Sequence, residues 1–266
     1  MLPQQTDPLP NPTSAVSRGK FNTQRYDFFS SLSLLLVLLQ PYYMIVTCMS
    51  QGQAGNLDLS LTSENVAVDL DNYGPPIDLQ RLFSRAAPLH LEIGSGKGTF
   101  LLNYARQHPE INLLGIEWAN KYYRYSVDRM RRWQITNVRI LRADAREFIA
   151  AYLPDQCIAA FHIYFPDPWP KKRHHKRRFF QPAVLNQVAR CLTSDGQLRT
   201  ATDHAEYFEI ISDLLQNHPE TARHFEPIEF FPSEAADPGE WVGSNFERKY
   251  RKEGRNIYTL AVRKIG

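Results

Sequence analysis

A regular alternation of short apolar runs with helical patterns is the feature that most constrains the fold of this 266-residue chain. Alternation of this kind is typical of βαβ units, in which helices of about ten residues connect parallel strands. Six strands are predicted, at residues 89–93, 111–118, 138–141, 157–165, 197–201 and 257–263. The sequence therefore predicts an α/β fold built on a mostly parallel sheet.

Segments whose apolar residues have helical spacing lie between these strands. One helix begins after a glycine-rich loop and ends at Pro109, and four more are predicted at residues 121–133, 145–153, 182–191 and 204–216. A Ser-Asp-Gly turn is expected at residues 194–196, directly before the fifth strand. Residues 230–243 are expected to form a loop.

The first 50 residues differ in composition from the rest of the chain. Residues 1–30 are rich in Pro, Ser, Asn and Gln, which is typical of unstructured segments. The apolar stretch 31–49 is interrupted at residues 40–41, whereas a membrane span needs about 20 apolar residues. Translation beginning at Met44 or Met49 is favoured over a membrane anchor or a signal peptide. We expect an extension at 1–50, a lead-in at 51–87 and the main domain at 88–266.

Net charge and cysteine content narrow the class of protein. The formal net charge is only +3, so any affinity for nucleic acid must come from local clustering of cations. The three cysteines, Cys48, Cys157 and Cys191, form no C-x-x-C pair and no zinc-binding spacing. They indicate a reducing, cytoplasmic compartment, and no metal site is predicted.

The first predicted strand runs into LEIGSGKG, residues 91–98. In open parallel sheets, ligands bind beyond the carboxyl ends of the strands, and glycines let the backbone approach the ligand closely. The spacing of Gly94, Gly96 and Gly98 matches neither the dinucleotide fingerprint G-x-G-x-x-G nor a P-loop. This mismatch weakens the interpretation of the loop as a dinucleotide or ATP site but excludes neither ligand.

Three acids are placed at the ends of successive predicted strands around this loop. Glu92 lies two residues before the first glycine, where it would repel a pyrophosphate but suit a ligand with a cationic head. Glu117 is placed to bind ribose hydroxyls, and Asp144 lies where an adenine edge would be. This arrangement suits S-adenosylmethionine, a nucleoside with positive charge. The alternatives are salt-bridged acids at Glu92 and Glu117 and a helix cap at Asp144.

The fourth predicted strand leads into FPDPWPKKRHHKRR, residues 165–178. Prolines preset the turn, Trp169 offers a flat face to a base, and Asp167 can accept hydrogen bonds from the N–H groups of a base. The basic run at 171–178 has no interleaved acid and would supply phosphate contacts to RNA. The alternatives are a rigid surface loop and a solvated, charged helix start. The helix at 121–133 adds Arg124, Arg129, Arg131, Arg132, Tyr122, Tyr123, Tyr125 and Trp133.

These segments together resemble the bacterial single-subunit tRNA (guanine-N7)-methyltransferase family. The resemblance is carried by LHLEIGSGKG, LLGIEW, FPDPWPKKRHHKRR, ATDHAEY and SNFERKYRKEG, and it covers about residues 89–264. It implies a Rossmann-like class I methyltransferase fold: a seven-stranded, mainly parallel sheet with a reversed last strand and helices on both faces. It also implies transfer of a methyl group from S-adenosylmethionine to N7 of guanine 46 in the variable loop of tRNA.

The resemblance also implies roles for particular residues. The cofactor-binding set is Glu92, Gly94, Ser95, Gly96, Glu117, Asp144 and Asp167, of which Asp167 is also catalytic. The substrate-binding set is Lys171, Asp203, Ser244, Asn245, Phe246 and Glu247. The RNA contacts expected from the basic run are Lys172, Arg173, His174, His175, Lys176, Arg177 and Arg178. The chain departs from many members at residues 248–250, where those members lead into R-G.

Guanine N7 carries a lone pair at neutral pH, so the predicted reaction needs alignment of the reactants rather than a base or a metal. We expect Asp167 and Asp203 to hold the edge of the guanine. The expected partner is tRNA, the expected assembly is a monomer or homodimer, and no membrane association is expected. Three alternatives stay open: an inactive nucleic-acid-binding module, an NAD-dependent oxidoreductase, and a methyltransferase acting on another RNA base or a small molecule.

Overall fold

The computed structural model describes residues 63–266. The expected extension at 1–50 lies outside the described residues, as does the lead-in up to residue 62. The division of the chain at these boundaries therefore stays a prediction. None of the helices in the described part is long and apolar enough to cross a membrane.

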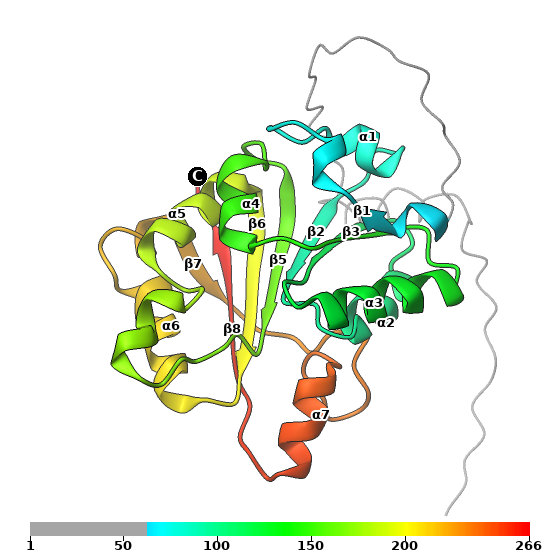
Figure 1. Ribbon diagram of the computed structural model, residues 1–266. Coiled ribbons are helices and arrows are strands. Elements are labelled where there is room, and N and C mark those ends of the chain that lie inside the picture. Colours follow the sequence, from blue (N-terminus) through cyan, green and yellow to red (C-terminus); the bar gives the residue numbers. More distant parts are fainter. Residues whose placement is uncertain (1–62) are drawn as a thin grey trace, which may run out of the picture. The chain divides into compact units, whose positions relative to one another are not determined.

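A single sheet lies at the centre of the described domain (Figure 1). Its eight strands are β1 (Ala67–Val68), β2 (Leu89–Ile93), β3 (Asn112–Ile116), β4 (Val138–Leu141), β5 (Ile158–Tyr164), β6 (Leu192–Thr202), β7 (Phe225–Ile228) and β8 (Tyr258–Lys264). Their spatial order is β1-β4-β3-β2-β5-β6-β8-β7. Strand β8 pairs antiparallel with β6 and β7, and the remaining pairs in this sheet are parallel. The expected α/β fold with a reversed last strand is confirmed.

The count of eight strands corrects the expectation of seven. The additional strand is β1, whose two residues pair with Ile140 and Leu141 of β4 at the edge of the sheet. A strand this short leaves no apolar alternation in the sequence. Residue patterns also missed β7, because it contains Pro227, which an edge strand tolerates but which argues against a strand in a sequence.

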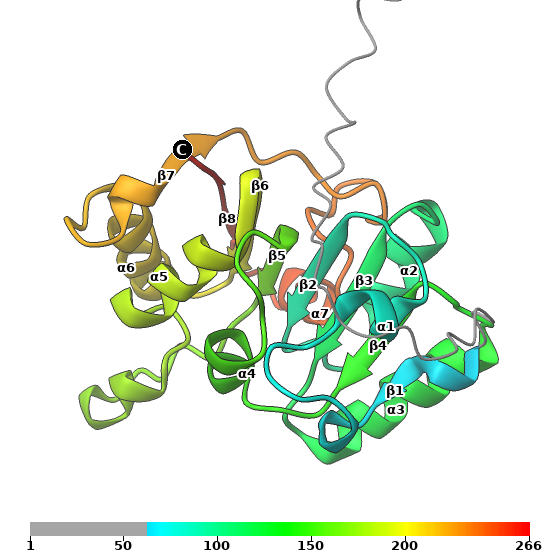
Figure 2. The same ribbon diagram turned by 90° about the horizontal axis from the view of Figure 1, so that it is seen from above.

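Helices cover both faces of the sheet, as predicted (Figures 1 and 2). On one face, α2 (Thr99–Gln107) and α3 (Asn120–Arg132) pack on Leu113 and Ile140. The other face packs on Leu91 and Phe161 and is covered by α1 (Leu79–Phe83), α4 (Ala145–Ala151), α5 (Pro182–Cys191) and α6 (Ala205–Gln216). The last helix, α7 (Asn245–Lys252), was not predicted and follows a loop that extends from β7.

The predicted boundaries are correct for β2, β4 and α5, whereas the turn expected at 194–196 is wrong. Those residues lie inside β6, which runs without a break from Leu192 to Thr202. Asp195 has a φ of 62°, and the pairing of β5 with β6 shifts register between Ile158 and Ala160. The turn-forming residues therefore produce an irregularity within the strand rather than separating it from α5.

The glycine loop between β2 and α2 determines how closely α2 approaches α3. Gly98, the last glycine of the loop, has a φ of +66°, which side chains other than glycine rarely adopt. A Cβ atom at this position would lie 2.9 Å from both Ser126 Cβ and Met130 Cε on α3. The position therefore needs glycine for its backbone conformation and for its packing.

We expect Gly98→Ala to lower the free energy of unfolding by about 2–4 kcal/mol, because it adds overpacking to the cost of a left-handed residue. Gly254→Ala is the matched control, since Gly254 has a φ of +72° and nothing within 4 Å of an added Cβ. Urea unfolding should give a loss of about 1 kcal/mol for the control. Equal losses in the two variants would contradict the packing role of Gly98.

Candidate active site

The predicted site residues gather where the carboxyl ends of the parallel strands meet their loops. The glycine loop follows β2, Glu117 follows β3, Asp167 follows β5 and Asp203 follows β6. These four strands are consecutive in the sheet, in the order β3-β2-β5-β6. The sheet therefore brings together residues that are far apart in the sequence, at the edge where open parallel sheets bind ligands.

The glycine loop is fixed to the end of β3 by its backbone. Gly94 N and Ser95 N both donate to the carbonyl oxygen of Ile116, at 2.8 and 3.1 Å. Gly96 N donates to Oε2 of Glu117 at 2.8 Å, and Ala119 N donates to Oε1 of the same carboxylate at 2.8 Å. Glu117 therefore binds backbone N–H groups and is not the salt-bridged acid of the alternative interpretation.

Glu92 is buried beneath this loop, with only 4% of its surface exposed. Within residues 63–266, its Oε2 atom has no hydrogen-bond partner, and neither has the buried hydroxyl of Ser95. Burial, together with the nearby charge of Glu117, raises the pKa of Glu92 to about 8. An unpaired buried carboxyl group of this kind is costly unless a cation or donor reaches it, which fits a ligand that carries an ammonium group.

The floor of the site next to Glu92 is made of neutral polar groups. His162 lies opposite Glu92 in the parallel pairing of β2 with β5. Its ring nitrogens contact His90 at 3.1 Å and the hydroxyl of Tyr164 at 2.8 Å. Burial lowers the pKa of His90 to about 3 and holds that of His162 well below its ordinary value. Both histidines are therefore neutral near pH 7, and neither supplies a positive charge to Glu92.

Asp144 lies three residues beyond the end of β4 and caps α4. Its Oδ1 accepts a hydrogen bond from Arg146 N at 2.9 Å, and its Oδ2 forms an ion pair with Arg146 Nη2 at 2.8 Å. The hydrogen bond from the Arg146 side chain lowers the pKa of Asp144. The helix-cap interpretation of Asp144 is therefore confirmed, and its contact with a ligand stays a prediction.

The turn after β5 is rigid, and it leaves Asp167 exposed to solvent. Phe165 and Trp169 have positive φ values of 53° and 41°, and Phe165 N donates to Ala201 O on β6 at 2.7 Å. Arg178 is only 4% exposed and donates from Nε to Pro168 O at 2.7 Å. Its guanidinium also lies over the ring of Tyr207 at 4.9 Å. Arg178 therefore holds the turn from beneath, and its contact with RNA stays a prediction.

The rest of the basic run forms a short 3-10 helix, Lys172–Arg177, that packs on Trp169. His174 lies edge-on to the Trp169 ring at 5.6 Å, and the guanidinium of Arg177 lies over it at 5.1 Å. Five cationic side chains of the run are exposed: Lys171, Lys172, Arg173, Lys176 and Arg177. Positive charge is therefore concentrated directly beside the turn that carries Asp167.

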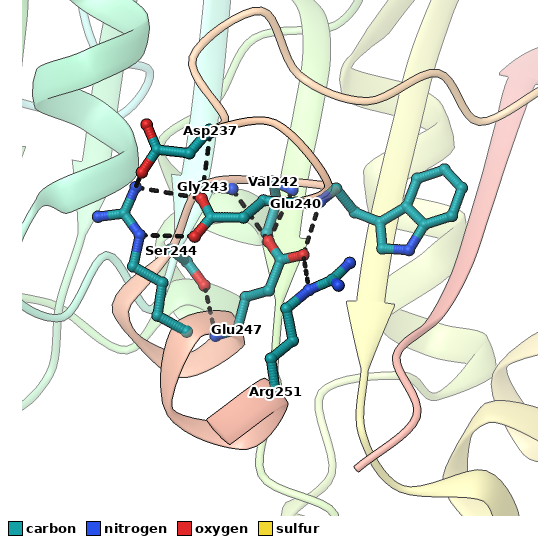
Figure 3. A network of polar contacts seen from close by, with 9 residues as sticks. Asp237, Glu240, Val242, Gly243, Ser244, Glu247 and Arg251 are labelled. Atoms are coloured by element: carbon teal, nitrogen blue, oxygen red, sulfur yellow. Dashed lines mark hydrogen bonds and ion pairs between the residues drawn. The ribbon is translucent and has the colours of Figure 1, made fainter. Parts of the chain in front are cut away.

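The loop before α7 is organised around one buried carboxylate (Figure 3). Glu247 is fully buried and accepts hydrogen bonds from the backbone N–H groups of residues 241, 242 and 243 at 2.6, 2.9 and 3.0 Å. Arg251 Nε donates to it at 3.0 Å, and Ser244 Oγ caps α7 by accepting from Glu247 N at 3.1 Å. The carboxylate of Glu247 therefore holds the loop, and its contact with substrate stays a prediction.

Two aromatic residues of α7 connect the glycine loop with the Asp167 turn. A Cβ atom at Gly96 would lie 3.8 Å from Cε2 of Phe246, which is itself 44% exposed. The Phe246 ring lies 6.3 Å from the ring of Phe165 and 6.1 Å from that of Tyr250. Sequence reasoning missed Tyr250, although an aromatic residue four positions after Phe246 is a usual signal of one helix face.

Asp203 is already paired in this structure. Its Oδ2 accepts a hydrogen bond from Arg255 Nη1 at 2.7 Å, and the same guanidinium lies over the ring of Tyr250 at 4.6 Å. Asn245 and Lys171 are exposed. Among residues 63–266, no group of three or more His, Cys, Asp or Glu side chains is arranged to hold a metal ion.

The raised pKa of Glu92 makes a prediction about stability. Between the ordinary pKa of 4.5 and about 8, the folded protein keeps a proton on Glu92 that the unfolded chain loses. As the pH rises through this range, the free energy of unfolding of the wild type should therefore fall relative to that of Glu92→Gln. The fall should be at most about 1.4 kcal/mol per pH unit, and it should level off above this range. Urea unfolding of both proteins from pH 5 to pH 9 measures this, and parallel curves would contradict it.

Comparison with known proteins identifies the family. Residues 86–260 match a family model described as "Putative methyltransferase". The tRNA (guanine-N(7)-)-methyltransferase of Alkalilimnicola ehrlichii is 40% identical over 72% of this chain and 78% of that protein. The enzymes of the same name from Leifsonia xyli and Halorhodospira halophila are 38% and 37% identical, over 75% and 70% of this chain and 86% and 79% of their own lengths. The chain belongs to the tRNA (guanine-N7-)-methyltransferase family.

Proposed function

We propose that this protein transfers a methyl group from S-adenosylmethionine to N7 of guanine 46 in the variable loop of tRNA. One observation carries the proposal: Phe246 connects the glycine loop with the Asp167 turn, and that turn is flanked by exposed cations. A cofactor loop, a base-binding acid and a polyanion-binding surface therefore share one end of the sheet.

The cofactor is held, in this proposal, by Glu92, Gly94, Ser95, Gly96, Glu117, Asp144 and Asp167. S-adenosylmethionine supplies a methyl group on a positively charged sulfonium, which is already electrophilic. Glu92 binds the ammonium group, because its unpaired Oε2 needs a cationic or donating partner. Glu117 and Asp144 each keep free lone pairs beside their backbone hydrogen bonds, and these can accept from hydroxyl or amino groups of the nucleoside.

The guanine is positioned by acids on two neighbouring strands. Asp167 follows β5 and Asp203 follows β6, and both can accept hydrogen bonds from the N1–H and amino groups of a guanine. Asp167 also stabilises the positive charge that develops on the ring as N7 is alkylated. Because Asp203 is paired with Arg255, the base must either share this carboxylate or replace the guanidinium. Lys171, Ser244, Asn245 and Phe246 complete the substrate-binding set.

The RNA backbone is bound by the basic run: by the exposed Lys172, Arg173, Lys176 and Arg177 and by the half-buried His174 and His175. Contacts of this kind supply sequence-independent affinity and position the substrate. The partner is tRNA, and we also propose a cytoplasmic location, no membrane association, and a monomer or homodimer as the assembly. The observation that supports the RNA surface is the exposure of five cations beside Asp167.

Asp167→Asn and Asp203→Asn should each lower the rate of tRNA methylation by about 100-fold or more, because an amide cannot stabilise developing positive charge as a carboxylate does. The assay uses tritiated S-adenosylmethionine and total tRNA, with the labelled nucleoside identified after digestion. Asp195→Asn is the matched control, since Asp195 is exposed within β6 away from the site, and it should keep wild-type activity. Unchanged rates in both test variants would contradict the assignment, and label in another nucleoside would contradict guanine N7 as the target.

The basic run offers a comparison of two arginines with different roles. Arg173→Ala removes an exposed cation, so it should reduce the dependence of log Kd for tRNA on log salt by about one unit and leave stability unchanged. Arg178→Ala removes a buried guanidinium that bonds the Asp167 turn, so it should lower the free energy of unfolding by about 2–3 kcal/mol. Filter binding at several salt concentrations and urea unfolding measure the two effects. The proposed roles fail if both variants change the same quantity.

A further inference from the structure

Helix α3 and the residues that flank it carry exposed aromatic side chains, Trp118, Tyr122, Tyr125 and Trp133, here called the α3 stripe. Their exposed fractions are 67%, 40%, 45% and 53%, and they are four of the seven large apolar or aromatic side chains that are exposed among residues 63–266. At 3.6 residues per turn Tyr122 and Tyr125 fall on one side of the helix; Trp133 is the C-terminal cap residue, and Trp118 precedes the first turn. The opposite side packs on the core through Val127 and Met130, so core packing does not explain the stripe.

Cations from three other parts of the chain lie against the stripe. The guanidinium of Arg142 is 5.8 Å from the ring of Trp118, Lys97 Nζ is 5.9 Å from that of Tyr125, and the guanidinium of Arg106 is 4.9 Å from that of Trp133. Helix α3 adds five cations and one acid: Lys121, Arg124, Arg129, Arg131, Arg132 and Asp128. The stripe is therefore an aromatic surface within a strongly positive field.

The combination of exposed aromatic rings with cations indicates which kind of partner the stripe binds. A second copy of the chain would bring the same positive surface against itself, which like-charge repulsion opposes. Exposed aromatic rings beside Lys and Arg are how proteins bind unpaired nucleotides: the bases stack on the rings and the phosphates contact the cations. The bases of double-stranded RNA are already stacked on one another, so they cannot stack on these rings. The chemistry fits an unpaired stretch of RNA.

The stripe is connected to the cofactor loop. Trp118 directly follows Glu117, which binds Gly96 N. Arg129 Nη1 donates to Thr99 Oγ1 at 2.7 Å and to Lys97 O at 3.3 Å. From Tyr122 to Trp133 the stripe extends about 16 Å at the rise of a helix. It thus begins beside the proposed cofactor site and leads away from it.

We propose that the α3 stripe is a stacking surface for unpaired nucleotides of the tRNA, which the enzyme must open to expose its target guanine. The inference rests on the proposed function. A guanine within a folded RNA has to leave its stack before it can enter the site, and its neighbours then lose their own stacking partners. Aromatic rings beside the site replace those partners and stabilise the opened RNA.

The test measures tRNA binding in the full chain, without turnover. The variant Tyr125→Leu/Trp133→Leu keeps apolar bulk but removes two rings, and it should bind tRNA about tenfold more weakly. Tyr125→Phe/Trp133→Phe keeps the rings and should bind within about twofold of wild type. The matched control is Phe231→Leu, because Phe231 is 60% exposed outside the stripe and should not affect binding. Affinity for S-adenosylmethionine and the free energy of unfolding should be unchanged in all three variants.

A second measurement uses the fluorescence of Trp133. A short unstructured oligoribonucleotide should quench wild-type emission, and Trp133→Phe should lose part of that quenching. The inference is overturned if the leucine variant binds tRNA with wild-type affinity. It is also overturned if the wild type and the phenylalanine variant are dimers and the leucine variant is a monomer. A separate assay measures whether the wild-type enzyme forms 7-methylguanosine. This assay distinguishes an error in the inference about the stripe from an error in the proposed function.

Discussion

The architecture of the site depends on a buried acid, Glu92, whose Oε2 atom has no partner in the described part of the chain. Burial and the like charge of Glu117 raise the pKa of Glu92 to about 8, and the neighbouring histidines are neutral, so Glu92 is protonated near pH 7. This arrangement costs stability, and a ligand that places a cation or a hydrogen-bond donor at that point relieves the cost.

Two further buried charges support the parts of the site that we propose to face the substrate. Arg178 bonds the carbonyl groups of the proline-rich turn from below, which leaves Asp167 on the exposed side. Glu247 gathers three backbone N–H groups and Arg251, which fixes the start of α7 and with it Phe246 and Tyr250. Each of these charges binds several partners, as buried charges must. Loops that would otherwise be mobile are thereby held in place against the rigid sheet.

The sequence predicted the sheet well because apolar runs such as 89–93 and 138–141 lie between clear helix signals. The acids around the glycine loop were also predictable, since their spacing from the strand ends fixes where they gather. Burial of individual charges was not predictable: nothing among eight successive basic or histidine residues indicates that Arg178 alone turns inward. The start of α7 did leave a signal, because Ser244 and Glu247 have the spacing of a capping box, and Ser244 indeed accepts from Glu247 N.

The most direct test of this account is the number of protons released when S-adenosylmethionine binds. Calorimetric titrations at pH 7 in two buffers of different ionisation enthalpy give that number. If Glu92 is protonated in the free protein and ionised against the ammonium group, wild type should release close to one proton and Glu92→Gln should release none. Binding of the cofactor to wild type without proton release, or equal release in both proteins, would contradict the central role of Glu92.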